Sequence, residues 1–133
     1  MSDGSWELQQ AVYGVLNGLS PALASGGVHS PAPANAALPY VEIGESDAVA
    51  ADVQGRDGLD ETITIHVWTV AGSFQPARDI ISRIREALHA QKLNVVGRSA
   101  ALAFVGSTRV FTDSDGASIH GVVTLTVHHY SET

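Results

Sequence analysis

Cysteine is absent from the 133-residue sequence, which excludes disulfide bonds and every form of thiolate chemistry. Basic residues are scarce too, because seven Lys and Arg stand against 14 Asp and Glu, for a formal net charge of -7. Proteins that bind a nucleic-acid duplex rely on Lys and Arg to neutralise its phosphates. The charge therefore argues against specific nucleic-acid binding as the main function.

Long hydrophobic runs are missing as well, since none approaches the roughly 18 residues of a membrane-spanning helix. The first four residues, 1–4, are polar and acidic, unlike the start of a secretory signal. We therefore expect a protein that is made in the cytoplasm, where something assembles it, and that binds no membrane.

Charged residues amount to only 16% of the chain, against roughly 25% in an ordinary soluble domain. Much of the surface must then be neutral, which suits a subunit that buries surface against its neighbours; a small monomer rich in Ala and Gly fits equally well. The length and the 44% hydrophobic content predict one domain, residues 1–133, with a real core.

Helical periodicity marks two segments of the chain. In residues 5–19, with Ser5 as the expected N-cap, apolar residues recur with 4-3-4 spacing at Leu8, Val12, Val15 and Leu19. The second segment follows Ser73 and Pro76, and it carries a salt-bridge spacing from Asp79 to Arg83. Its apolar stripe consists of Ala77, Ile80, Ile81, Ile84 and Leu88.

Strands are predicted at 40–45, 62–70, 99–111 and 120–130, with a turn at 112–116. Ile63, Ile65 and Val67 alternate with polar residues, so we expect them to face the second helix. The fold class is therefore α+β, in the order α-β-β-α-β-β, with a mostly antiparallel or mixed sheet and two helices packed on it. Residues 24–39 read as an extended linker and 46–60 as a long, mobile loop.

The side chains needed for catalysis do not come together in the sequence. There is no G-x-S-x-G motif and no phosphate-binding loop, and Asp113 and Asp115 fit a turn better than a calcium loop. Six histidines invite a metal site, yet no pair has a diagnostic helical spacing. We predict a protein that is not an enzyme and has no cofactor, and we keep a metal-dependent enzyme using His66 and His120 as the alternative.

Charge is segregated along the chain. Seven acids and one base lie between Glu42 and Glu61, whereas six bases and two acids lie between Pro76 and Arg109. Complementary patches favour head-to-tail contact between copies, although they can also screen each other within a monomer. The expected interface residues are Asp47, Asp52, Arg56, Asp57, Asp60, Arg78, Arg83 and Arg85. Trp6 and Tyr13 are either a second contact patch or the edge of the core.

Five short motifs in order resemble one family. They are Leu8-Gln9-x-Ala11-Val12-Tyr13, Pro39-Tyr40-Val41-x-Ile43-Gly44-Glu45, His66-Val67-Trp68, Ile84-Arg85-x-Ala87-Leu88-His89 and Asp113-x-Asp115-Gly116-x-x-x-His120-Gly121-Val122. From Trp6 to Tyr130 the chain resembles the tail terminators, or tail-completion proteins, of long-tailed phages and gene transfer agents. The segment Val28-His29-Ser30-Pro31 departs from the family, which more often has an aromatic and an acidic residue there.

The resemblance implies a subunit of a sixfold ring at the head–tail junction of a virion. Such a ring sits on the last ring of tail-tube protein, stops further polymerisation and presents a surface to the head connector. The family has no catalytic residues to transfer. A neighbouring head-completion or stopper protein of the connector is the alternative within the same particle.

Overall fold

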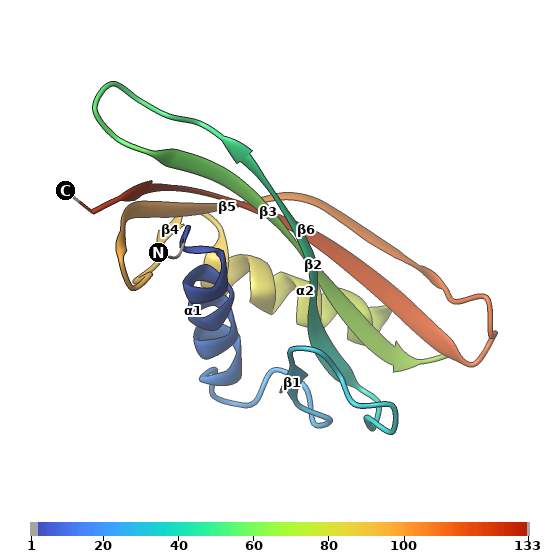
Figure 1. Ribbon diagram of the computed structural model, residues 1–133. Coiled ribbons are helices and arrows are strands. Elements are labelled where there is room, and N and C mark those ends of the chain that lie inside the picture. The colour runs from blue at the N-terminus through green and yellow to red at the C-terminus, as the bar shows by residue number, and fades with distance from the viewer. Residues whose placement is uncertain (1–2, 133) are drawn as a thin grey trace.

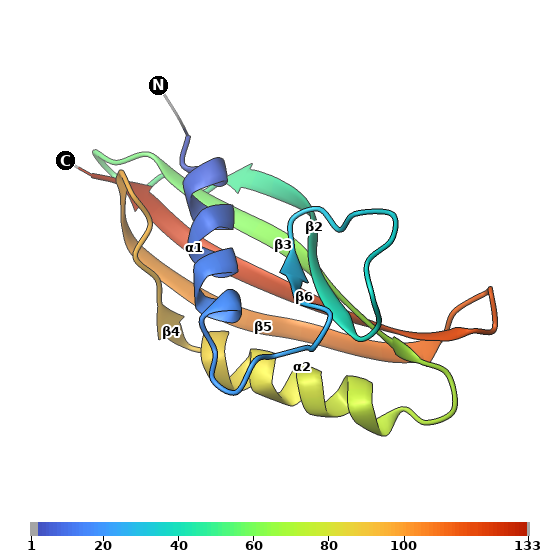
Figure 2. The same cartoon turned by 90° about the horizontal axis from the view of Figure 1, so that it is seen from below.

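In the computed structural model, which describes residues 3–132, the chain forms one six-stranded sheet with two helices on one face (Figures 1 and 2). The sheet order is β1-β2-β3-β6-β5-β4. The elements are α1 (Ser5–Asn17), β1 (Val28–His29), β2 (Tyr40–Ala50), β3 (Gly58–Val70), α2 (Gln75–Leu88), β4 (Gln91–Lys92), β5 (Arg98–Thr112) and β6 (Ser118–Ser131). The predicted α+β class and element order are confirmed, with β1 and β4 added as short edge strands.

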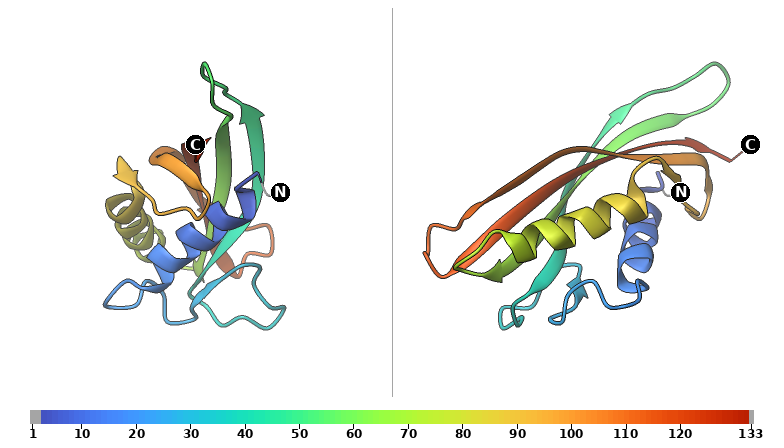
Figure 3. Two further views of the ribbon diagram at one scale, coloured as in Figure 1. Left: turned by 60° about the vertical axis from the view of Figure 1, so that its left-hand side comes forward. Right: turned by 180° about the vertical axis from the view of Figure 1, so that it is seen from behind.

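The sheet is mixed because β1 pairs in parallel with β2, while every other neighbouring pair is antiparallel. Its four long strands give the molecule an elongated shape. The β2–β3 hairpin projects past α1 at one end of the sheet, and the β5–β6 hairpin projects at the other end (Figures 1 and 3). The start of α1 and the end of β6 both lie at the β2–β3 end (Figure 1).

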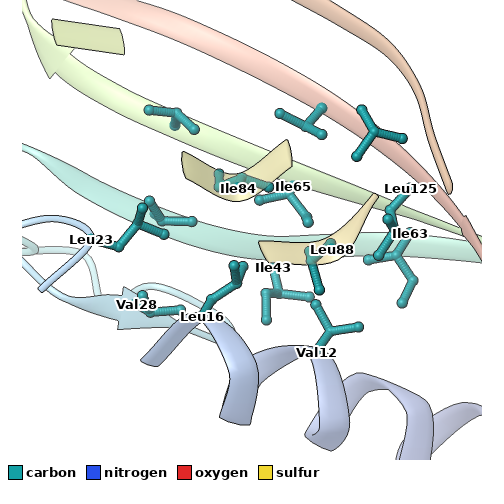
Figure 4. Close-up of a cluster of buried hydrophobic side chains, with 14 of the residues drawn as sticks. Val12, Leu16, Leu23, Val28, Ile43, Ile63, Ile65, Ile84, Leu88 and Leu125 are labelled. Atoms are coloured by element: carbon teal, nitrogen blue, oxygen red, sulfur yellow. The ribbon is translucent and has the colours of Figure 1, made fainter. Parts of the chain in front are cut away.

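One hydrophobic core fills the space between the sheet and the helices. Ile63, Ile65 and Val67 of β3 are fully or almost fully buried, as their alternation predicts. The stripe of α2 is buried in the same cluster, where Ile65, Ile84 and Leu88 lie together (Figure 4). Burying a large aliphatic side chain stabilises the fold by about 1.5–3 kcal/mol, so this cluster holds α2 on the sheet.

The predicted helix start and stripe of α1 are only partly right. Leu8, Val12 and Leu16 are fully buried, whereas Val15 and Leu19 are partly buried, because the helix crosses the sheet with a 4-4 spacing toward it. Ser5 does not cap α1. Gly4, with a φ of 91°, takes that position, and the Ser5 hydroxyl donates instead to Glu61 at 3.1 Å.

The predicted long loop at 46–60 is wrong in its secondary structure. Residues 46–50 continue β2 and residues 58–60 begin β3, so only 51–57 connect the two strands. Residues 46–50 extend beyond the core, and all five are exposed. Polar and small residues therefore replace the alternating apolar pattern by which a strand is recognised in sequence. Whether the hairpin is mobile stays a prediction.

The linker 24–39 runs without regular structure apart from β1, and it closes the core beside α1. Leu23, Ala24 and Val28 are buried there. Gly26 sits in a narrow gap, because its N–H donates to the carbonyl of Pro39 at 2.7 Å and a Cβ would lie 1.7 Å from the carbonyl oxygen of Ala37. Only glycine fits at this position.

Candidate assembly surfaces

The hairpin of residues 46–60, which we name the acidic arm, carries four of the predicted interface acids. Asp52 accepts a hydrogen bond from the Gly58 N–H at 3.0 Å, and Asp60 pairs with the His128 imidazole. Asp52 therefore closes the turn of the hairpin, and Asp60 fastens the hairpin to β6. Within residues 3–132, the carboxylates of Asp47 and Asp57 have no hydrogen-bond or ion-pair partner, so they are available to a second molecule.

Arg56, the single base of the arm, folds back onto its own subunit. Its guanidinium donates to the Ser99 hydroxyl and to the carbonyl of Ser131, and it lies 5.6 Å from the ring centre of Tyr130. These contacts tie the turn of the arm to β5 and β6. Arg56 thus has a role within the subunit, and its interface role stays a prediction.

The three arginines of α2 divide in the same way. Arg83 donates to the carbonyls of Pro21 and Ala22 at 2.6 and 3.0 Å and so fastens the linker to the helix. The spacing from Asp79 to Arg83 does not produce an ion pair, because Asp79 instead accepts from Gln75 at 2.6 Å. Arg78 and Arg85 are exposed.

The acidic arm and the α2 arginines do not pair within one subunit. Each of the three ion pairs between residues 3–132 joins a histidine to a carboxylate. The arm is part of the β2 edge of the sheet and points away from α2. The helix α2 lies along the other edge, next to β5 (Figures 2 and 3). No ion pair between the described residues therefore supports the alternative that the acidic and basic patches screen each other within a monomer.

The sheet face opposite the helices carries a row of rings in register across four strands. The row runs from Tyr40 through Trp68 and His120 to Phe111, with ring centres 6.4, 3.8 and 4.9 Å apart. Trp68 and His120 are stacked, with 11° between their planes. The two rings therefore cover each other's faces, which stabilises the middle of the sheet.

His66 and His120, the pair named for a possible metal site, are neighbours in this face. Nδ1 of His66 lies 2.8 Å from Nε2 of His120, and Nε2 of His66 lies 3.0 Å from a carboxylate oxygen of Glu45. Residues 3–132 contain no group of three or more side chains placed to hold a metal ion. The facing ring nitrogens of His66 and His120 are instead joined in a chain of hydrogen bonds that ends at Glu45.

Burial lowers the pKa of His120, and the nearby charges of His66 and Arg109 lower it further. The carboxylates of Asp113 and Glu42 act in the opposite direction and offset part of this shift. The hydrogen bond from His66 lowers the pKa of Glu45. His120 is therefore neutral over a wider pH range than an exposed histidine.

A buried polar cluster escaped prediction. The side chains of Glu61 and His129 are 2% and 0% exposed, and His129 Nε2 lies 3.3 Å from a Glu61 carboxylate oxygen. Arg98 donates to the other ring nitrogen of His129, and Ser5 donates to Glu61. The signal was available, because Glu61 is in phase with Ile63 and His129 with Val127 at the inward positions of their strands.

Trp6 lies outside the core, with 58% of its surface exposed, while Tyr13 packs against the core. The core-edge interpretation is right for Tyr13 and wrong for Trp6. Together with Gln9, Gln10 and His29, these two residues line an open hollow beside β1 of about 510 Å³. No helix among residues 3–132 combines the length and the apolar character needed to cross a membrane.

Comparison with known proteins matches residues 10–130 to a family described as tail completion protein gp17. A curated relative, the tail completion protein gp17 of Bacillus phage SPP1, is 32% identical over 85 residues, which make up 64% of this chain and 63% of that protein. Among solved structures, a chain from the virion of a native gene transfer agent particle superposes with a TM-score of 0.83 at 19% identity, covering 98% of this chain and 100% of that one. The structural likeness carries the fold alone.

Proposed function

This chain belongs to the tail completion protein gp17 family, and from that premise we propose that it forms a ring capping the head-proximal end of a tail tube. Membership makes it a structural component of a phage-type virion tail. The proposed ring stops tube polymerisation and offers its far side to the head connector. Its partners are then other copies of itself, the tail-tube protein and a connector or stopper protein.

The observation that carries the ring is the unpaired charge on two separate surfaces. Asp47 and Asp57 on the acidic arm, and Arg78 and Arg85 on α2, all lack a salt-bridge partner within the described chain. Surfaces of opposite sign at different places on one molecule favour head-to-tail contact, which closes into a ring when the rotation permits. We propose that the arm of one copy lies against α2 of the next, and that six copies close the ring.

A non-enzymatic role agrees with how the candidate catalytic groups are used. His66, His120 and Glu45 bond to one another, and His129 and Glu61 are buried beneath the sheet. These groups hold strands together. The proposed function accordingly needs no cofactor.

Tube growth in the presence of the chain tests this proposal. Tail-tube protein of the same particle is polymerised with and without the purified chain, and tube lengths and tube ends are recorded by electron microscopy. We expect the chain to bind one end as a ring and to arrest growth there. Rings that bind purified head connector but leave tube growth unchanged would assign the chain to the connector instead.

A further inference from the structure

The sheet has two open edges at diagonally opposite places. On β2, the parallel strand β1 covers only Val41 and Glu42, so no strand within residues 3–132 lies on the outer side of residues 46–50. On β5, β4 covers Leu102 and Ala103, and His89 accepts the Val105 N–H at 3.0 Å. Residues 108–112 are therefore open as well.

The hydrogen-bonding groups on these two segments match in number. The Ala51 N–H donates to Gly58 across the hairpin, so by alternation the backbone groups of Ser46, Ala48 and Ala50 point outward. The Asp113 N–H donates to Ser118, so those of Thr108, Val110 and Thr112 point outward on β5. Unpaired edges of this kind are templates for adding a strand.

We propose that successive copies join edge to edge, with residues 46–50 of one copy antiparallel to residues 108–112 of the next. Ala48 lies opposite Val110, Ser46 opposite Thr112 and Ala50 opposite Thr108. The inference rests on the proposed ring and supplies its main contact. Strand direction agrees, because β2 and β5 are antiparallel within one subunit and rotation about a ring axis keeps them so.

This register avoids the strands that cover the two edges. With Ala48 opposite Val110, the residues covered by β1 fall opposite 116–117, in the turn that follows β5. The residues covered by β4 fall opposite 55–56, in the turn of the acidic arm. In this register neither β1 nor β4 would collide with the strand of the neighbouring copy.

Charge selects the β2-to-β5 contact over contacts between like edges. Asp47 and Arg109 both lie on the helix-free face, since they pair with Thr62 and Val122, and the register makes them diagonal neighbours. A β2–β2 contact would bring Asp47 toward its own copy, and a β5–β5 contact would do the same for Arg109. The proposed register also carries the arm tip toward β4 and the last turn of α2, where Lys92 and Arg85 lie.

The two open segments lie at opposite ends of the strands, because Ser46 is level with Val105, whereas Phe111 is level with Tyr40. Each added copy is thus shifted along the strand direction. Such a stagger is what a closed sheet of tilted strands requires. Closure would leave neither of these two segments as a free edge.

The absence of native cysteine allows a direct test by disulfide formation. One batch of chain carries Ala48→Cys and a second carries Val110→Cys, and the two are mixed at high concentration under an oxidant. Cα atoms opposite each other in a ladder lie within disulfide range, so we expect about tenfold more cross-linked dimer than in a mixture of Ala48→Cys with Val96→Cys. Val96 is 81% exposed but lies off both edges, and each batch alone serves as a further control.

Hydrogen exchange of the unmodified chain gives a second reading, in which the Ala48 and Val110 amides become protected on oligomerisation. Rings without the cross-link or this protection would overturn the edge contact and leave the capping function standing. A cross-link in a chain that does not arrest tube growth would support the contact while removing the proposed function. A chain that shows neither oligomer nor cross-link at any concentration overturns the edge contact.

Discussion

Nε of Arg98 donates a hydrogen bond to Nδ1 of His129 across 2.9 Å, which leaves the proton of the neutral imidazole on Nε2. That nitrogen faces a carboxylate oxygen of Glu61, whose side chain is 2% exposed. The imidazole therefore links an arginine to a buried carboxylate, and Ser5 connects the same carboxylate to the first turn of α1. Three strands and one helix meet at this cluster.

Removal of the Glu61 carboxylate should destabilise the fold. Glu61→Ala leaves the buried imidazole N–H of His129 and the Ser5 hydroxyl without their acceptor, and a buried donor left without its acceptor costs about 1–3 kcal/mol. Urea unfolding followed by circular dichroism measures the change. Asp60→Ala is the matched control, since the neighbouring Asp60 is 41% exposed and its pair with His128 should contribute at most about 1 kcal/mol. Equal losses in the two variants would contradict the role of the cluster.

The centre of the core is tested by placing one charge on each face of β3. Ile65→Asp puts a carboxylate among apolar groups, and we expect it to abolish cooperative folding. Thr64→Asp places the same group on the helix-free face, where it should change stability by less than about 1 kcal/mol. Thermal melts decide the matter. A cooperatively melting Ile65→Asp variant would mean that β3 is not central.

Two glycines should respond to alanine in opposite directions. Gly26→Ala forces a Cβ against backbone carbonyls, so the linker must move and stability must fall. Gly14 lies inside α1, where a Cβ meets nothing within 4 Å. Gly14→Ala should therefore raise the free energy of unfolding by about 1 kcal/mol through helix propensity. Chemical denaturation of both variants measures the two signs, and a tolerated Gly26→Ala would refute the close packing of the linker.

Stability should fall as the pH is lowered through the range of His120. Its folded pKa lies below 6.5, mainly because of burial, so the unfolded chain binds the proton more readily. The contribution is complete above pH 6.5 and is lost as the pH falls toward the folded pKa. His120→Gln should flatten the stability profile in this window. The pKa of Glu45 is lowered from 4.5, so the loss of stability that comes from its protonation begins at lower pH. That loss should remain in the His120→Gln variant.

The fold was predictable wherever one face of an element is buried. The stripe of α2 and the alternation of Ile63, Ile65 and Val67 define the core in the sequence itself. The β2 side of the arm was missed because residues 46–50 are all exposed and therefore carry no alternation of apolar and polar residues. The charge split in the sequence names the arm and α2 as interface candidates, but it could not show that Arg56 and Arg83 bond within the subunit.

The open edges could not be predicted, because they depend on pairing between distant segments. Nothing in the residues around Val110 distinguishes an inner strand from an edge strand. Only the two-residue length of β4 leaves residues 108–112 uncovered. The same holds for β2, where the end of β1 decides which residues remain open.

Reversal of the free charges on α2 should block assembly without unfolding the subunit. Arg78→Glu with Arg85→Glu removes the two α2 arginines that have no hydrogen-bond or ion-pair partner within residues 3–132, and it sets like charges against the neighbour's arm. Exposed pairs contribute about 0–1 kcal/mol each, so either change alone should do little. Native mass measurements at low and moderate salt record the oligomer, and a thermal melt confirms the fold.

Restoration by a second reversal separates this contact from a general effect of charge. A chain that also carries Asp57→Lys reverses the free acid at the tip of the arm, so its attraction to the reversed α2 returns and oligomers should re-form. Asp47 is left unchanged, because it lies on the helix-free face beside Arg109 of the next copy and not beside α2. Arg83→Gln is the control on α2, because it should lower stability through the lost bonds to Pro21 and Ala22 while assembly persists. If the doubly reversed α2 variant assembles as well as the parent, the arm and α2 are not in contact, and the backbone edges alone would have to hold the ring.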